Sequence, residues 1–238
     1  MKVDILAIGA HPDDIELSAA GTILKAIDQG KKVAVVDLTA GELGTRGSGE
    51  LRLKEAQRSA EILGLSAREN LGMKDGFFQN DEAHLRLLAT LIRKYQPDIV
   101  LANAIEDRHP DHGRAAKLIS DACFYSGLRR IETTEAGKPQ EAWRPKALYH
   151  YIQDRFAQPD FVVDVGPYVE QKMEAIKAFE SQFYNPASKE PESPLTMKNF
   201  FDFLKGRMAD MGRYIQADYA EGYHFSRPVG VEDLSTLK

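Results

Sequence analysis

Short apolar runs alternate with segments of helical periodicity through the first half of this chain. The runs at residues 3–9, 33–38 and 99–102 are rich in Val, Ile and Leu, as expected for strands buried on both faces of a parallel sheet. The helical segments are residues 15–29, 51–63, 85–95 and 111–125. This alternation predicts an α/β fold, with an open, mostly parallel sheet flanked by helices.

The second half of the chain is less regular. Residues 146–152 and 161–165 have the composition of strands, whereas residues 168–183 and 197–217 have helical spacing. Residues 185–194 contain three prolines and are predicted to form a loop. We find no convincing linker, so we expect one domain over residues 1–238.

Composition excludes several classes of function. A net charge of -5 argues against general nucleic-acid binding and against binding to an anionic membrane surface. The single cysteine, Cys123, excludes an internal disulfide and a zinc site made mainly of thiolates. The N-terminal apolar run is too short for a secretory signal, so we expect a cytoplasmic protein.

Two tetrapeptides of one type stand out. Residues 11–14 read His-Pro-Asp-Asp and residues 109–112 read His-Pro-Asp-His, whereas composition predicts roughly 0.02 chance occurrences of His-Pro-Asp. Each tetrapeptide lies between a predicted strand and a predicted helix. The carboxyl ends of the strands are where open α/β sheets bind ligands, so the two tetrapeptides meet in one crevice if their strands are neighbours.

The residue types suit a catalytic metal. Two histidines and one carboxylate leave the fourth position of a zinc ion open, and a second carboxylate nearby can act as general base. The adjacent Asp13 and Asp14 could divide these two roles. A non-haem iron site uses similar ligands. The alternative is helix capping, because Asp is a good N-cap and Pro a good first residue of a helix, but two copies at two strand ends favour a metal site.

At these residues the chain resembles the LmbE/PIG-L family of zinc-dependent sugar de-N-acetylases. The likeness includes both tetrapeptides, the glycine-rich segment 39–47, and residues 51–56 and 180–183. The resemblance implies a Rossmann-like fold with the metal site at the carboxyl ends of the strands. It also implies removal of acetate from an N-acetylglucosamine ring.

The resemblance assigns roles to individual residues. It implies three zinc ligands, His11, Asp14 and His112, with Fe²⁺ as the alternative ion. It implies that Asp13 is the general base that activates water. It implies that a protonated His109 stabilises the tetrahedral oxyanion, with Asp111 orienting its imidazole.

The resemblance also suggests a substrate. Length and local sequence are most similar to the bacillithiol-biosynthesis branch of the family, which implies N-acetylglucosaminyl L-malate. Arg52 and Arg108 are candidates for binding the malate carboxylates, because arginine binds carboxylates through two parallel hydrogen bonds. Chitooligosaccharides and antibiotic precursors are alternative substrates. The family suggests a homo-oligomer, such as a hexamer.

Two alternative functions agree less well with the residues of this sequence. A nicotinamide-dependent oxidoreductase needs Gly-x-Gly-x-x-Gly after the first strand, but residues 9–13 read Gly-Ala-His-Pro-Asp. A protein that only binds sugar or metal has no need of Asp13 next to a ligand. Outside the tetrapeptides, we expect His224 and the aromatic residues of segment 200–203 to be structural, the latter in the core or a subunit interface.

Overall fold

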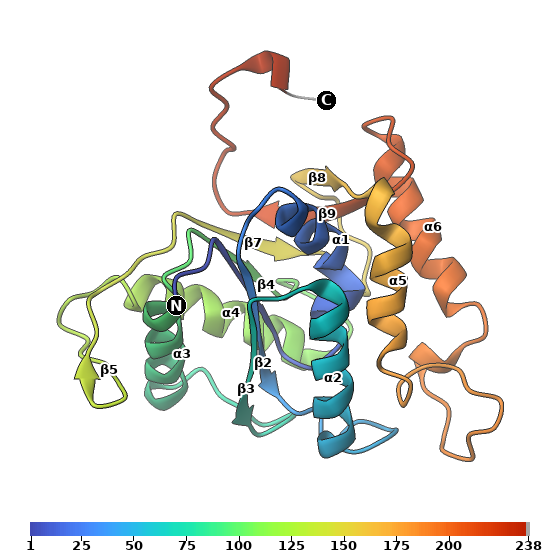
Figure 1. The fold of residues 1–238 in the computed structure, drawn as a ribbon, viewed down its shortest axis with the longest axis horizontal. Helices are drawn as coiled ribbons and strands as arrows, with labels where there is room; N and C mark the ends of the chain where they lie inside the picture. Colours follow the sequence, from blue (N-terminus) through green and yellow to red (C-terminus); the bar gives the residue numbers. More distant parts are fainter. Residues whose placement is uncertain (237–238) are drawn as a thin grey trace.

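The computed structural model describes residues 1–236 and contains a seven-stranded sheet in the order β3-β2-β1-β4-β7-β9-β8 (Figure 1). The strands are β1 (Ile5–Gly9), β2 (Val33–Thr39), β3 (Ala67–Met73), β4 (Ile99–Ala102), β7 (Ala147–Tyr151), β8 (Phe161–Asp164) and β9 (Ala220–Phe225). The first five of these are parallel, and β9 runs antiparallel to both β7 and β8. The α/β prediction is therefore confirmed.

Six α-helices connect and cover the strands. They are α1 (Asp14–Asp28), α2 (Gly49–Leu63), α3 (Glu82–Tyr95), α4 (Pro110–Tyr125), α5 (Val169–Lys177) and α6 (Phe200–Arg213). A two-stranded hairpin of β5 (Thr134–Glu135) and β6 (Lys138–Pro139) and short 3₁₀ turns at Gly166–Tyr168, Pro194–Thr196 and Leu234–Thr236 complete the fold. Within residues 1–236, no helix has the length and apolar character needed to cross a bilayer.

The two faces of the sheet carry separate cores because side chains alternate along each strand. Leu6 and Ile8 of β1 pack with the apolar faces of α3 and α4. Ile5 and Ala7 point the other way and pack with α1. Helices α3 and α4 thus cover one face, and α1, α2 and α5 lie together on the other (Figure 1).

Strands β1 and β4 are direct neighbours in the sheet. Ile5 pairs with Ile99, and Ala7 pairs with Leu101, so the carboxyl ends of the two strands lie at the same edge. The turn after β1 contains the first tetrapeptide, and the loop after β4 leads to the second. The predicted convergence of the two tetrapeptides is therefore confirmed at the level of topology.

Besides the unpredicted β5–β6 hairpin, four elements differ from the sequence predictions. The predicted helices 168–183 and 197–217 are shorter, because α5 ends at Lys177 and α6 spans Phe200–Arg213. The helical apolar pattern extends past α5 because the following turn still buries Phe179 and Phe183 in the same core cluster. Strands β3 and β9 were not predicted, because charged residues interrupt their apolar pattern.

Strand β9 holds α1 through a buried ion pair. Lys172 of α5 donates a 2.6 Å hydrogen bond to Glu221, and both side chains are almost completely buried. The Glu221 carboxylate also accepts the backbone N–H groups of Gly21 and Thr22 at 2.9 and 2.7 Å. These contacts fix the helix that directly follows the His-Pro-Asp turn and begins at Asp14.

Candidate active site

The first tetrapeptide forms a strained turn between β1 and α1. Asp13 adopts φ 110° and ψ −22°, a left-handed conformation that is uncommon for any residue with a side chain. Asp13 occupies the N-cap position of α1, but its carboxylate makes no capping hydrogen bond. The capping alternative is therefore wrong for Asp13, and strain of this kind is concentrated at functional sites.

The second tetrapeptide begins α4. His109 is the N-cap residue, and its Nδ1 accepts the backbone N–H of Asp111 at 3.2 Å, while Pro110 occupies the first turn. Because Nδ1 accepts, the neutral ring carries its proton on Nε2. The Asp111 carboxylate does not orient this ring as we expected: it accepts the N–H of Gly76 and pairs with Arg114. The main chain of the helix, rather than a carboxylate, fixes the orientation of His109.

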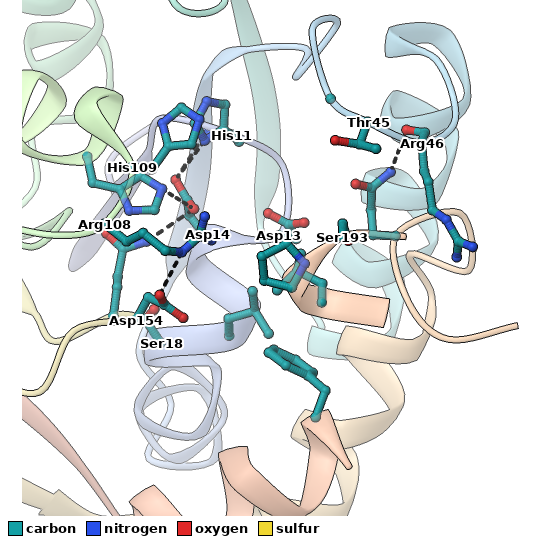
Figure 2. Close-up of a pocket in the computed structure, with 18 of the residues that line it drawn as sticks. His11, Asp13, Asp14, Ser18, Thr45, Arg46, Arg108, His109, Asp154 and Ser193 are labelled. Carbon is teal, nitrogen blue, oxygen red and sulfur yellow. Dashed lines mark hydrogen bonds and ion pairs between the residues drawn. The ribbon is translucent and has the colours of Figure 1, made fainter. Parts of the chain in front are cut away.

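The imidazoles and the Asp14 carboxylate meet in one cluster. The ring centroids of His11, His109 and His112 lie 4.7–5.6 Å apart. Asp14 Oδ1 is 3.2 Å from His112 Nε2, and Asp14 Oδ2 is 3.7 Å from His11 Nδ1. Figure 2 shows His11 and His109 around Asp14 on one side of the pocket. The structure thus brings together the three predicted ligands.

This cluster has the dimensions of a metal site. Bonds of about 2.0–2.2 Å to a tetrahedral ion place neighbouring ligand atoms about 3.3–3.6 Å apart. The two distances from Asp14 to the histidines, 3.2 and 3.7 Å, bracket that range. Each Asp14 oxygen thus lies close to one imidazole nitrogen, and the carboxylate and the two imidazoles are the donor types of a divalent-cation site.

Two carboxylates bind the outer nitrogens of these histidines. Asp75 lies 3.0 Å from His11 Nε2, and Asp107 lies 2.5 Å from His112 Nδ1. Carboxylates in this position orient ligand imidazoles and make them stronger donors to a metal. The sequence analysis did not identify either residue.

A second group of possible ligand atoms is already occupied by other partners. Atoms of His11, Asp75 and Asp111 lie within 4.8 Å of one another. However, Asp75 accepts the N–H of Leu43, and Asp111 is bound as described above. The Asp14 oxygens also have partners within the chain, but the Asp14 site offers two imidazoles where the second group offers one, which favours the Asp14 site for Zn²⁺.

The carboxylates around His11 and His112 favour positive charge at the cluster. Burial lowers the pKa of His11, but the hydrogen bonds of Asp111 and Asp75 and the charge of Asp14 outweigh it and raise the pKa to about 9. Burial also opposes protonation of His112, but Asp14 and Asp107 raise its pKa to about 10. The pKa of Asp14 is far below its usual range despite burial, because of His112 and His11. A bound cation would take the place of the two protons.

His109 differs from the other two histidines. Burial and the positive charges of His11 and His112 lower its pKa. This shift disfavours a protonated ring, and the protonated His109 that the resemblance implies stays a prediction. A neutral ring with its proton on Nε2 can still donate a hydrogen bond to a developing oxyanion.

Asp13 is held by Arg52. Nη2 of Arg52 donates a 2.8 Å hydrogen bond to Asp13 Oδ2 and another to the carbonyl of Pro12. Burial raises the pKa of Asp13, Arg52 opposes this rise, and the resulting pKa is about 6. Arg52 lines the pocket, but two of its nitrogens already have partners within the chain. Substrate binding by Arg52 stays a prediction.

The cluster forms the floor of a cavity of about 330 Å³. The glycine-rich loop contributes Thr45 and Arg46 to the wall opposite the histidines, with Asp13 between the two sides (Figure 2). Arg108 also lines the cavity and forms a 2.7 Å ion pair with Asp154. This location agrees with the predicted role of Arg108 in binding a substrate carboxylate, and that role stays a prediction.

Helix α6 forms a further wall of the cavity. Phe200, Phe203 and Leu204 line it. The prediction that this aromatic segment belongs only to the core or to an interface is therefore wrong in part, although Phe200 also packs on Phe183. His224 is on β9 opposite His150 and is not part of the cavity lining.

Other site residues were missed at the sequence level. Asn103 and Gln153 donate hydrogen bonds to the two oxygens of Asp14 at 2.9 and 3.1 Å. Asn103 directly follows β4, so a polar residue at a strand end was an available signal. Asp75 follows β3, a strand that the apolar pattern did not reveal, and it had no such signal.

Comparison with known proteins finds one family model and several related deacetylases. The family model for PIG-L, GlcNAc-PI de-N-acetylase, matches residues 6–123. The diacetylchitobiose deacetylase of Thermococcus kodakarensis is 32% identical, covering 75% of this chain and 70% of the relative. A probable N-acetyl-alpha-D-glucosaminyl L-malate deacetylase of Bacillus anthracis is 26% identical, over 75% and 81%.

One solved structure is similar over nearly the whole chain, and one of the similar proteins is a hydratase rather than a deacetylase. The conserved protein TT1542 of Thermus thermophilus superposes with a TM-score of 0.86 at 31% identity, covering 98% of each chain. The 4-oxalmesaconate hydratase of Pseudomonas putida is 29% identical, over 74% of this chain and 73% of the relative. The reaction must therefore be argued from the site as well as from the likeness.

Proposed function

We propose that this chain, which belongs to the PIG-L family, is a metal-dependent hydrolase that removes the acetyl group from an N-acetylglucosamine conjugate. One observation carries the proposal: Asp13, buried and strained, makes no capping bond and lines the cavity next to Asp14 of the ligand cluster. A site that only binds metal gains nothing from this second carboxylate.

The ligand cluster defines the position of the cation. His11, Asp14 and His112 would hold Zn²⁺, with Fe²⁺ as the alternative, and Asp75 and Asp107 would orient the two imidazoles. When bound, the ion polarises the amide carbonyl and lowers the pKa of water. The histidine and carboxylate donors suit either ion.

Asp13 would carry one proton from the attacking water to the leaving amine. Asp13, with a pKa of about 6, is ionised at neutral pH and takes a proton from the attacking water as the oxygen bonds to the carbonyl carbon. His109 donates a hydrogen bond from Nε2 to the oxyanion. The carbon–nitrogen bond then breaks, Asp13 returns the proton to the amine, and the products are acetate and a free amino sugar.

The sugar conjugate is a finer part of the proposal. N-acetylglucosaminyl L-malate, the substrate of bacillithiol biosynthesis, is supported by the malate deacetylase relative and by Arg108 at the cavity. Diacetylchitobiose is supported by the relative with 32% identity. Both substrates present the same acetamide to the cluster, and they differ in the group attached to the sugar.

An amine-release assay on these two substrates and on free N-acetylglucosamine tests the proposal. The enzyme loaded with Zn²⁺ should release equal amounts of amine and acetate. Asp13→Asn should retain the metal but lose about 10²–10⁴-fold in kcat, the usual contribution of a general base. Wild-type turnover in this variant would exclude the role of Asp13, and a lack of acetate from every substrate would exclude the deacetylase.

A further inference from the structure

The cavity of the candidate active site contains more positive charge than the chain itself neutralises. Four arginines line it, and three of them have partners within the chain. Arg52 pairs with Asp13, and Arg108 pairs with Asp154. The third, Arg46, donates to three main-chain carbonyls at 2.8–3.3 Å, so its hydrogen-bonding capacity is used in holding the glycine-rich loop.

The fourth arginine is Arg207 of α6. Across residues 1–236 it has no hydrogen-bond acceptor and no ion-pair partner, although it is only partly exposed. Burial lowers the pKa of its guanidinium, and the charges of Asp154 and Asp107 oppose this change. The group is nevertheless charged at any physiological pH. A cation that loses water without gaining a partner raises the free energy of the folded protein, and an anionic ligand would remove that cost.

Helix α6 directs Arg207 toward the ligand space. Phe200, Phe203 and Arg207 follow one another at intervals of three and four residues, so they share one face of the helix, and all three line the cavity. The guanidinium itself is only partly exposed, so water does not fully surround it. An ion pair formed in such surroundings is stronger than one formed in water.

A second unpartnered polar group lines the same cavity. Ser18 of α1 lies one turn beyond Asp14 and is 4% exposed, and its Oγ has no hydrogen-bond partner among the described residues. Buried hydroxyl groups are normally hydrogen-bonded. The described lining of the cavity thus includes the Arg207 guanidinium and the buried Ser18 hydroxyl group, and neither has a hydrogen-bond partner among residues 1–236.

We infer that Arg207 binds a carboxylate or phosphate on the part of the substrate that remains after acetate leaves, and that it determines specificity for anionic conjugates. This inference rests on the proposed function, since it assumes that the acetamide occupies the histidine cluster. It assigns to Arg207 the recognition of an anionic group that the sequence suggested for Arg52 and Arg108. Arg207 is separate from the groups that move the proton.

The test compares three substrates with four proteins. The substrates are N-acetylglucosaminyl L-malate, N-acetylglucosamine 1-phosphate and the neutral diacetylchitobiose. The proteins are the wild type, Arg207→Ala, Arg207→Lys and the control Arg213→Ala, which changes an exposed arginine of the same helix. The malate and phosphate arms distinguish the two kinds of anion.

The expected result is selective. Arg207→Ala should lower kcat/KM about 10- to 100-fold for whichever anionic conjugate the wild type prefers, mainly through KM, because one charge-assisted contact is lost. Diacetylchitobiose should change by less than about threefold. Arg207→Lys should be intermediate and Arg213→Ala unchanged. Equal losses on all substrates, no loss on the anionic ones, or a wild type that prefers the neutral substrate would overturn the inference.

A binding measurement separates this inference from the proposed function. Calorimetry with Asp13→Asn and with the double variant Asp13→Asn/Arg207→Ala reports affinity for each conjugate without turnover. If the wild type hydrolyses no substrate, the proposed function fails, but a selective loss of anion affinity in the double variant would still support Arg207. Equal affinities in the two proteins would contradict the role of Arg207 whatever the wild type hydrolyses.

Discussion

The guanidinium of Arg52 and the carboxylate of Asp13 form a 2.8 Å ion pair from which solvent is almost excluded, with the residues 5% and 4% exposed. Burial alone would keep Asp13 protonated at neutral pH, and a protonated carboxyl group cannot accept a proton from water. The positive charge of Arg52 limits this effect and leaves the pKa of Asp13 at about 6. The pair therefore explains how a buried acid can act as a base.

Replacing Arg52 by Met should weaken the base without removing it. An opposite charge at this distance typically lowers a carboxyl pKa by about one to three units, so its loss should move the acidic limb of the kcat/KM profile to higher pH by about that amount. Activity at pH 6–7 should fall accordingly. The pH–rate profile of acetate release measures the shift.

Two variants make this prediction specific. Arg52→Lys keeps the charge and should restore most of the shift. Arg58→Met removes an exposed arginine of the same helix, which pairs with Glu180, and should leave the profile unchanged. An acidic limb in Arg52→Met that coincides with the wild type would show that Arg52 does not control Asp13.

The outer carboxylate Asp107 should control metal affinity. Asp107→Asn leaves all three donor atoms in place but weakens the hydrogen bond that orients His112, so Zn²⁺ affinity should fall about 10- to 100-fold. His112→Ala should lose the ion outright on dialysis. Competition with a chromogenic chelator measures both effects.

A matched change on α4, the helix that carries His112, provides the control. Asp121→Asn alters a carboxylate that pairs with Lys117 at the surface, and its Zn²⁺ affinity should equal that of the wild type. If Asp107→Asn also bound Zn²⁺ as tightly as the wild type, the orienting role of Asp107 would be excluded.

Metal binding should depend steeply on pH. Without a cation, His11 and His112 have pKa values of about 9 and 10, so both are protonated at pH 7 and must lose their protons before they coordinate. Apparent Zn²⁺ affinity should therefore rise between pH 6 and 8, by about one to two powers of ten per pH unit, and level off above about pH 10. Calorimetry in buffers of different ionisation enthalpy should detect one to two released protons. Binding without proton release would contradict the assigned ligands.

The sequence predicted the ligand cluster better than its surroundings. The two tetrapeptides could be identified because the His-Pro-Asp pattern is rare and follows apolar strands, and the order of β1 and β4 in the sheet brings both copies together. The resemblance to the family then assigned His11, Asp14 and His112 as ligands. Arg207 was not recoverable, because its distinguishing property is the lack of a partner among the described residues, and that depends on where every other charge lies in three dimensions.

Secondary structure was missed for the same kind of reason. Strand β9 contains Glu221, a charge that an apolar pattern treats as exposed. Its burial is possible only because Lys172 and the backbone N–H groups of α1 surround it. A long-range ion pair of this type leaves no local pattern along the chain.

That ion pair leads to a prediction about stability. Glu221→Gln leaves the Lys172 ammonium buried without a carboxylate, and loss of one partner of a buried pair typically costs about 3–5 kcal/mol. The double variant Lys172→Met/Glu221→Gln removes the stranded charge and should be more stable than Glu221→Gln alone. Urea unfolding at pH 7 measures the free energies of unfolding.

An exposed ion pair between α5 and α6 tests whether burial is the cause. Glu170→Gln breaks the contact of Glu170 with Lys205 at the surface and should cost less than about 1 kcal/mol. If Glu221→Gln and Glu170→Gln had the same free energy of unfolding, burial would not determine how much the Lys172–Glu221 ion pair contributes to stability. If the double variant were the least stable of all, the unpaired Lys172 ammonium would not cause the loss of stability. The loss would then come from the contacts between Glu221 and α1.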